Sequence, residues 1–208
     1  MQNVVPAPEL ALAERAVAAR RDQYATEVRR LIDAAFEVMG RAGDIDPQVR
    51  DIVKTAGLSN QAFYRHFASK DALMLAVLAD GQRQLVEYLS RRIADAGAPA
   101  AQLRAWIEGV MAQARNTDAA DRTRPFAING PRLADRFPAE LAASRTALIT
   151  TLEPTVLALG GSVADATLIC ELALARMNDA IANRRTPSRD EIESLVAFCR
   201  GGITHVRT

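Results

Sequence analysis

Residues 48–73 read QVRDIVKTAGLSNQAFYRHFASKDAL, and this stretch decides the fold. Val49, Ile52 and Val53 recur at the spacing of one helical face, so a short amphipathic helix is expected at its start. Gly57 should end that helix, because glycine adopts the left-handed conformation of a helix C-cap at little cost.

A second short helix is expected over residues 60–66. Ser59 can cap it by accepting a hydrogen bond from a free backbone N–H, and Ser69 can cap a third helix in the same way. Two short helices joined by a tight glycine turn form a helix-turn-helix. On the side opposite Phe63, the second helix carries side chains that can reach the base edges and phosphates of DNA: Asn60, Gln61, Tyr64 and Arg65.

The same stretch resembles the DNA-binding domain of the TetR family of bacterial repressors. Four motifs carry the resemblance in order and spacing within residues 28–75: V-R-D-I, A-G-L-S, F-Y-R-H-F and S-K-D-A-L. The sequence departs from the family at Val53, where alanine is usual, and at residues 46–48, which replace a threonine-rich helix start. Gln61 and Ala62 stand where glycine and threonine are common. The resemblance therefore implies DNA binding but no particular operator sequence.

Residue chemistry assigns roles within the motif. Asn60 and Gln61 are expected to read bases, because an amide can bond adenine in a bidentate way; a solvated helix start is the alternative. Tyr64 resembles the family's phosphate-contacting tyrosine, and would otherwise be a core aromatic beside Phe63. Lys70 stands at a helix N-terminus, where phosphates bind well, and would otherwise be solvated. The expected DNA-binding residues are Gln48, Arg50, Lys54, Ser59, Asn60, Gln61, Tyr64, Arg65, His66 and Lys70.

Composition favours an all-α chain. Of the 208 residues 49% are hydrophobic but only 5% are aromatic, so the core must consist mostly of Ala, Leu, Val and Ile. No stretch alternates apolar and polar residues as a strand would. Together with the resemblance, this predicts about nine helices, arranged as a three-helix DNA-binding domain and a C-terminal helical domain. The formal net charge is only +1, so DNA binding must come from a local patch.

Three parts are expected along the chain: an N-terminal arm over residues 1–24, helical or loose; the helix-turn-helix domain over 25–72; and an effector-binding and dimerisation domain over 73–208. The arm carries Arg15, Arg20 and Arg21. These arginines fit an arm that contacts DNA and equally fit a frayed, solvated helix.

Periodicity and helix breakers predict the other elements. A helix over residues 28–39 should stop at Gly40 and Gly43, and Asp46 should cap the next helix with Pro47 at its first position. Further helices are expected over 70–93, 103–111, 141–159 and 163–183 and after Ser188, with a loop over 116–124 and broken pieces over 125–138.

The sequence gives an enzyme little support. It contains no phosphate loop, H-E-x-x-H, C-x-x-C or G-x-S-x-G motif, and neither His66 nor His205 pairs with a cysteine or serine. Cys170 and Cys199 lie in apolar helical patterns and are expected to be core or interface thiols. No apolar run is long enough to span a membrane, and no signal peptide is recognisable, so a cytoplasmic protein without cofactor or metal is expected.

The resemblance also implies an apolar effector cavity and a dimer face made by the last two helices. The proline-broken segment 125–138 favours a cavity, since broken helices leave gaps in packing, although the prolines would also serve simply to turn the chain. The candidate ligand-binding residues are Trp106, Met111, Phe126, Asn129, Phe137, Leu141, Met177 and Asn178, each of which could instead be ordinary core.

We therefore expect a homodimeric transcriptional regulator that binds a palindromic double-stranded DNA operator, most simply a repressor released by a small apolar effector. The alternatives are an all-helical protein whose helix-turn-helix serves packing or protein contacts, and a helical enzyme with an unrecognised site. Specific, salt-sensitive DNA binding separates the first from the others.

Overall fold

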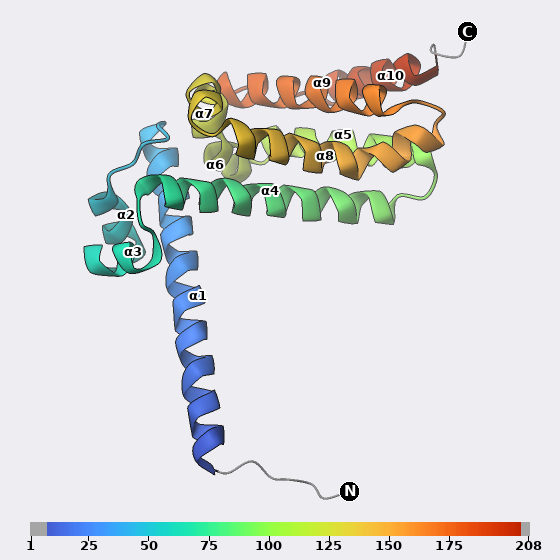
Figure 1. Ribbon diagram of the computed structural model, residues 1–208. Helices are drawn as coiled ribbons and strands as arrows, with labels where there is room; N and C mark the ends of the chain where they lie inside the picture. Colours follow the sequence, from blue (N-terminus) through green and yellow to red (C-terminus); the bar gives the residue numbers. More distant parts are fainter. Residues whose placement is uncertain (1–7, 205–208) are drawn as a thin grey trace, which may run out of the picture.

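The computed structural model describes residues 8–204, which are helical almost throughout and contain no strand (Figure 1). This confirms the all-α prediction; the expectations for residues 1–7 and His205 lie outside the described residues. Within this range ten helices follow one another: α1 (Pro8–Ala42), α2 (Val49–Ala56), α3 (Asn60–His66), α4 (Lys70–Asp95), α5 (Pro99–Arg115), α6 (Thr117–Ile128), α7 (Gly130–Arg136), α8 (Pro138–Ala158), α9 (Val163–Ala182) and α10 (Arg189–Thr204).

One apolar core joins the N-terminal helices. Met39 of α1, Ile52 of α2 and Phe63 of α3 are buried together in it, and Val77 from the third turn of α4 belongs to the same core. Leu133 of α7 belongs to the same core. The helix-turn-helix is therefore packed on the rest of the molecule through both α4 and α7.

A second core fills the C-terminal bundle. It contains Trp106 of α5, Leu152 of α8, Cys170 of α9 and Val196 of α10, all buried. Figure 1 shows α4, α5, α8, α9 and α10 running alongside one another, with α6 and α7 at the end of the bundle nearest the DNA-binding helices. The N-terminal half of α1 projects away from both cores, and every side chain from Leu12 to Thr26 is exposed.

The prediction of a loop over residues 116–124 is wrong, because α6 covers most of it. The Asn116 side chain caps this helix by accepting a hydrogen bond from the backbone N–H of Ala119, at 3.0 Å. The apolar side chains Ala120 and Ala127 pack against the C-terminal core, and Phe126 packs against the N-terminal one. The segment is polar overall because its other side faces solvent, and this hid a short amphipathic helix.

Two details at the end of α1 also differ from the sequence prediction. The helix continues through Gly40 to Ala42, where Gly43 ends it with φ 65°. The next helix begins at Val49 rather than at Pro47, and its N-cap residue Gln48 makes no capping hydrogen bond with its side chain. Asp46 does not cap it because its carboxylate accepts a hydrogen bond from Lys70 Nζ, at 2.7 Å.

Candidate nucleic-acid interface and effector cavity

The turn between α2 and α3 is built as the sequence predicts. Gly57 has φ 62° and ends α2 through hydrogen bonds back to the last turn, and the Ser59 hydroxyl accepts a hydrogen bond from Ala62 N at 3.1 Å. Added at Gly57, a Cβ atom would lie 2.8 Å from a guanidinium nitrogen of Arg30. That guanidinium donates to the Gly57 carbonyl at 3.2 Å. Arg30 of α1 therefore holds the turn that precedes α3.

Phe63 anchors the inner face of α3. Its side chain is fully buried, and its ring lies 5.9 Å from the ring of Phe67, which is also buried. Because a helix that buries one face must expose the other, this anchoring presents the opposite side of α3 to solvent. Tyr64 lies at the edge of that exposed side: it packs edge-on against Phe63, at 5.2 Å between ring centroids, yet its side chain is 61% exposed.

Most of the expected DNA-binding residues are exposed. Asn60 and Gln61 open α3 with exposed side chains, and Arg65 lies one turn further along. The remaining exposed members are Gln48, Arg50, Lys54 and Ser59, which come from α2 and the turn. Amide, hydroxyl and cationic groups of the kind that contact base edges and phosphates are thus accessible on α2, the turn and α3.

Several expected DNA-binding residues have partners within the protein: His66 and Arg65 contact Glu27, Arg50 pairs with Asp51, and Lys70 pairs with Asp46. The side chain of His66 is 1% exposed, which corrects the expectation of a direct DNA contact: its Nε2 lies 2.6 Å from the Glu27 carboxylate. Lys70 is partly exposed but forms an ion pair with Asp46, so a phosphate would compete with that carboxylate for its ammonium.

Glu27 of α1 ties the end of α3 to the long N-terminal helix. One carboxylate oxygen accepts from Arg65 and faces His66, both at 2.6 Å, and the other accepts from Gln23 at 3.1 Å. Tyr24 packs edge-on against the His66 ring at 4.4 Å between centroids. The His66 and Arg65 hydrogen bonds lower the pKa of Glu27 to about 2. Sequence reasoning missed this group because its partners lie 38 and 39 residues away.

Replacing Glu27 by Gln should lower the free energy of unfolding at neutral pH. The folded-state pKa of Glu27 is depressed from 4.5 to about 2, so its stabilisation is fully present above 4.5 and is lost as pH falls toward 2. The difference from wild type should therefore shrink over that window, as measured by urea unfolding at several pH values. Glu14→Gln, on the exposed part of α1, serves as control; a Glu27 effect that stays constant with pH would contradict this assignment.

A cavity of about 460 Å³ lies among helices α4–α9, and four of the eight expected ligand-binding residues line it: Phe126, Leu141, Met177 and Asn178. Its other walls come mainly from α4, α7 and α8, with Phe36 of α1 at one side. This volume lies within the range of small-molecule sites in proteins.

The other four expected ligand-binding residues do not line the cavity. Trp106 and Met111 are buried in the C-terminal core, where the Trp106 indole donates to the Thr151 hydroxyl at 2.9 Å. Phe137 is buried in the N-terminal core. The Asn129 amide donates to the Pro125 carbonyl, at 2.8 Å, and to that of Gly43. These residues pack in the cores or form hydrogen bonds with the backbone near the cavity. The size or polarity of a side chain alone did not distinguish such a residue from one that lines the cavity.

The outer face of α9 and α10 exposes large apolar side chains. Leu168 of α9 is 67% exposed and Phe198 of α10 is 71% exposed, with Val163 also exposed at the start of α9. Cys170 and Cys199 face inward on the same helices, and burial raises the pKa of each thiol to about 11. None of the helices in the described part of the chain is long and apolar enough to cross a membrane.

The caps, the buried anchor and the exposed polar face together define a helix-turn-helix protein of the DNA-binding type. Residues 31–77 match the family described as bacterial regulatory proteins, tetR family. This match covers the helix-turn-helix with the helices that flank it, and it agrees with the resemblance that the four motifs carry.

Comparison with individual proteins agrees with this assignment. The chain is 41% identical over 80 residues to the HTH-type transcriptional regulator BetI of Stenotrophomonas maltophilia, a match that covers 38% of this chain and 41% of that protein. The curated relatives are thus matched over only about two fifths of their length. The fold resembles crystal structures of a TetR-family regulator from Streptomyces coelicolor (TM-score 0.69, 20% identity, 88% and 97% of the two chains) and of the fatty acid degradation regulator FadR from Bacillus halodurans (0.63, 18%, 87% and 96%).

Proposed function

We propose that the protein is a homodimeric, DNA-binding transcriptional regulator, and specifically a repressor that a small effector releases from its operator. The observation that carries the proposal is the outer face of α3, where Asn60, Gln61 and Tyr64 are exposed on a helix held by a buried phenylalanine and two caps. A short helix presented in this way can enter the major groove and read base edges.

The proposed dimer forms through α9 and α10. Leu168 and Phe198 leave on this face the kind of apolar surface that a second copy would cover. An isologous pairing would place two α3 helices on one side of the assembly, which a palindromic operator with two half-sites requires. The residues proposed for DNA binding and those proposed for dimerisation lie on different helices, and we propose domains over 25–72 and 73–208.

Release would follow from ligand binding in the cavity. The cavity touches α1 and α4–α9, and α1 and α4 both reach the core of the DNA-binding domain. An effector that binds better to a conformation with another separation of the two α3 helices would shift the population away from the operator-binding form. The exposed part of α1 carries Arg15, Arg20 and Arg21, and we include it as an arm able to reach the phosphate backbone.

Two substitutions should separate base reading from phosphate binding. Gln61→Ala should relax the sequence preference, since a bidentate amide contact is worth roughly 1–3 kcal/mol of discrimination. Lys70→Ala should weaken binding to all sequences and flatten the salt slope by about one unit, because one phosphate contact is lost. Fluorescence anisotropy with the DNA upstream of the protein's own gene, and with a scrambled duplex, measures both effects over a salt series.

Asp46→Asn is the matched control for Lys70, because it removes the partner of the ammonium and keeps the cation. It should maintain or strengthen binding. Affinity and salt slope that are unchanged in Lys70→Ala would show that the ion pair with Asp46 persists on DNA and that the phosphate assignment is wrong.

A further inference from the structure

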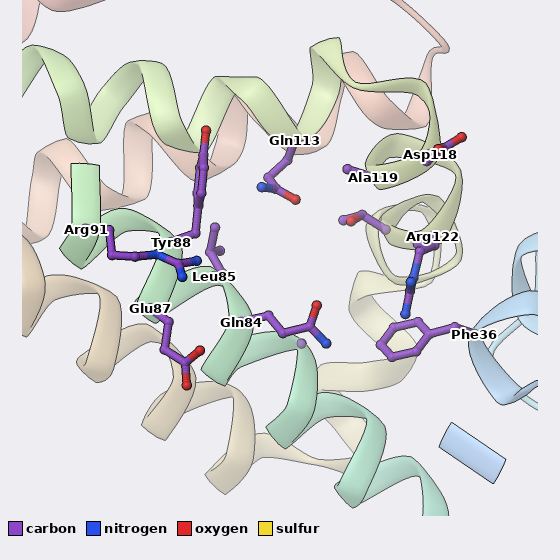
Figure 2. A pocket seen from close by; sticks show the side chains of 12 residues that line it. Phe36, Gln84, Leu85, Glu87, Tyr88, Arg91, Gln113, Asp118, Ala119 and Arg122 are labelled. Carbon is purple, nitrogen blue, oxygen red and sulfur yellow. The ribbon is translucent and has the colours of Figure 1, made fainter. Parts of the chain in front are cut away.

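Two hollows adjoin at the junction of the domains. The cavity described above shares Phe36, Gly81, Leu85, Gln113, Arg122 and Thr123 with a neighbouring one of about 430 Å³. The first is walled mainly by apolar side chains of α4, α7, α8 and α9. The second has a more polar lining, in which amides and charged groups stand beside Phe36, Leu85 and Tyr88 (Figure 2). A ligand that fills both must have an apolar part and a polar part.

Arg122 of α6 stands where the two hollows meet. Its guanidinium carbon lies 4.6 Å from the centre of the Phe36 ring, and its Nη2 lies 3.5 Å from the Asp33 carboxylate. Arg29 already binds that carboxylate through two hydrogen bonds, one of them from Nε at 2.9 Å. The Arg122 side chain is also 47% exposed. Its charge is therefore only weakly compensated, and its remaining N–H donors are available to a ligand.

The other charged side chains that line the two hollows are less suited than Arg122 to bind an anion. Arg145, which lines the apolar hollow, forms an ion pair with Glu171 at 2.9 Å. On the polar side, Glu87 is paired with Arg83 at 3.0 Å. Figure 2 shows Glu87 and Asp118 pointing away from the space between the helices, whereas Gln113 points into it. Arg91 of α4 adds a second cation to the lining of this hollow.

We infer that the effector is an amphipathic anion, whose carboxylate or similar group binds Arg122 while its apolar part occupies the hollow between α4, α7 and α8. This inference rests on the proposed function and names the chemical class of its ligand. A guanidinium binds a carboxylate through two parallel N–H donors, so it selects a planar anion over a neutral polar group.

The same arginine connects the ligand to the DNA-binding domain. Asp33 and Phe36 both belong to α1, the helix that also holds the turn before α3 and the end of α3. A bound anion would compete with Asp33 for the Arg122 guanidinium and loosen the contact between α6 and α1. Ligand binding and DNA binding would thereby be coupled, because the contact between Arg122 and Asp33 would be kept in the unliganded conformation and lost in the liganded one.

Direct calorimetry with matched probes tests the inference without DNA. Octanoate, octanamide and octyltrimethylammonium share an alkyl chain and carry a negative, a neutral and a positive head group. Wild type should bind octanoate roughly tenfold or more tightly than octanamide, and the cation least tightly. Arg122→Gln should lose this preference and Arg122→Lys should keep part of it. Arg104→Gln replaces an arginine of similar exposure that lines neither hollow, and should bind as wild type does.

Equal binding of octanoate and octanamide, tightest binding of the cation, an unchanged preference in Arg122→Gln, or no binding of hexanoate, octanoate or decanoate would each overturn the inference. Circular dichroism confirms that the variants are folded. The proposed DNA binding is tested separately, by anisotropy of the unliganded protein. A failure of that proposal can therefore be distinguished from a failure of the inference about the effector. Octanoate should also weaken operator binding by wild type but much less by Arg122→Gln.

Discussion

Phe63→Ala should lower the free energy of unfolding by about 3–5 kcal/mol, the usual cost of truncating a fully buried phenylalanine. Phe63 is 0% exposed and lies where α1, α2, α3 and α4 meet. Loss of the phenyl ring would leave a cavity beneath α3, so DNA binding should fall together with stability. Urea unfolding followed by circular dichroism measures the loss.

The neighbouring residue supplies the control. Tyr64→Ala removes an aromatic side chain that is mostly exposed, and should change the free energy of unfolding by less than about 1 kcal/mol while weakening DNA binding. Similar destabilisation by the two substitutions would mean that the helix does not bury the Phe63 side as described, and the outward face would have to be reassigned.

Phe198→Glu should dissociate the dimer and weaken operator binding by roughly a hundredfold or more, because each half-site would then bind independently. Phe198 is 71% exposed, so a glutamate there costs the isolated subunit little. Buried in a paired interface, the same charge would lack a partner. Sedimentation velocity should show dimers for wild type and monomers for Phe198→Glu.

Leu12→Glu is the matched control, since it places the same charge at a comparably exposed leucine on α1, far from α9 and α10 (Figure 1). It should leave the sedimentation coefficient unchanged. A monomeric wild type that still binds DNA specifically, or a Phe198→Glu variant that remains dimeric, would contradict the proposed interface.

Local chemistry explains why the helix-turn-helix could be predicted from the sequence. Gly57, Ser59 and Ser69 each act on backbone groups within a few residues, so their caps formed as predicted. The burial of Phe63 followed from its position opposite a polar stripe. Such features depend little on the rest of the fold, and for that reason the family motifs and the structure agree there.

Contacts between distant residues could not be predicted in this way. Glu27 gave no local signal, yet it faces His66 and so turns an expected DNA contact into a support for α3. Asp46 has the chemistry of a cap, but Lys70 takes its carboxylate. Arg122 lies in a stretch expected to be a loop. Its place beside the cavity depends on α6 packing against α1.

The most direct test of the account is equilibrium binding of the unmodified protein to the DNA upstream of its own gene. Anisotropy over a salt series, with a scrambled duplex of the same length, should show a dimer that prefers the native sequence by about a thousandfold or more, with affinity falling steeply as salt rises. Equal affinity for both duplexes, or no binding to either at low salt, would contradict the claim that α3 reads DNA.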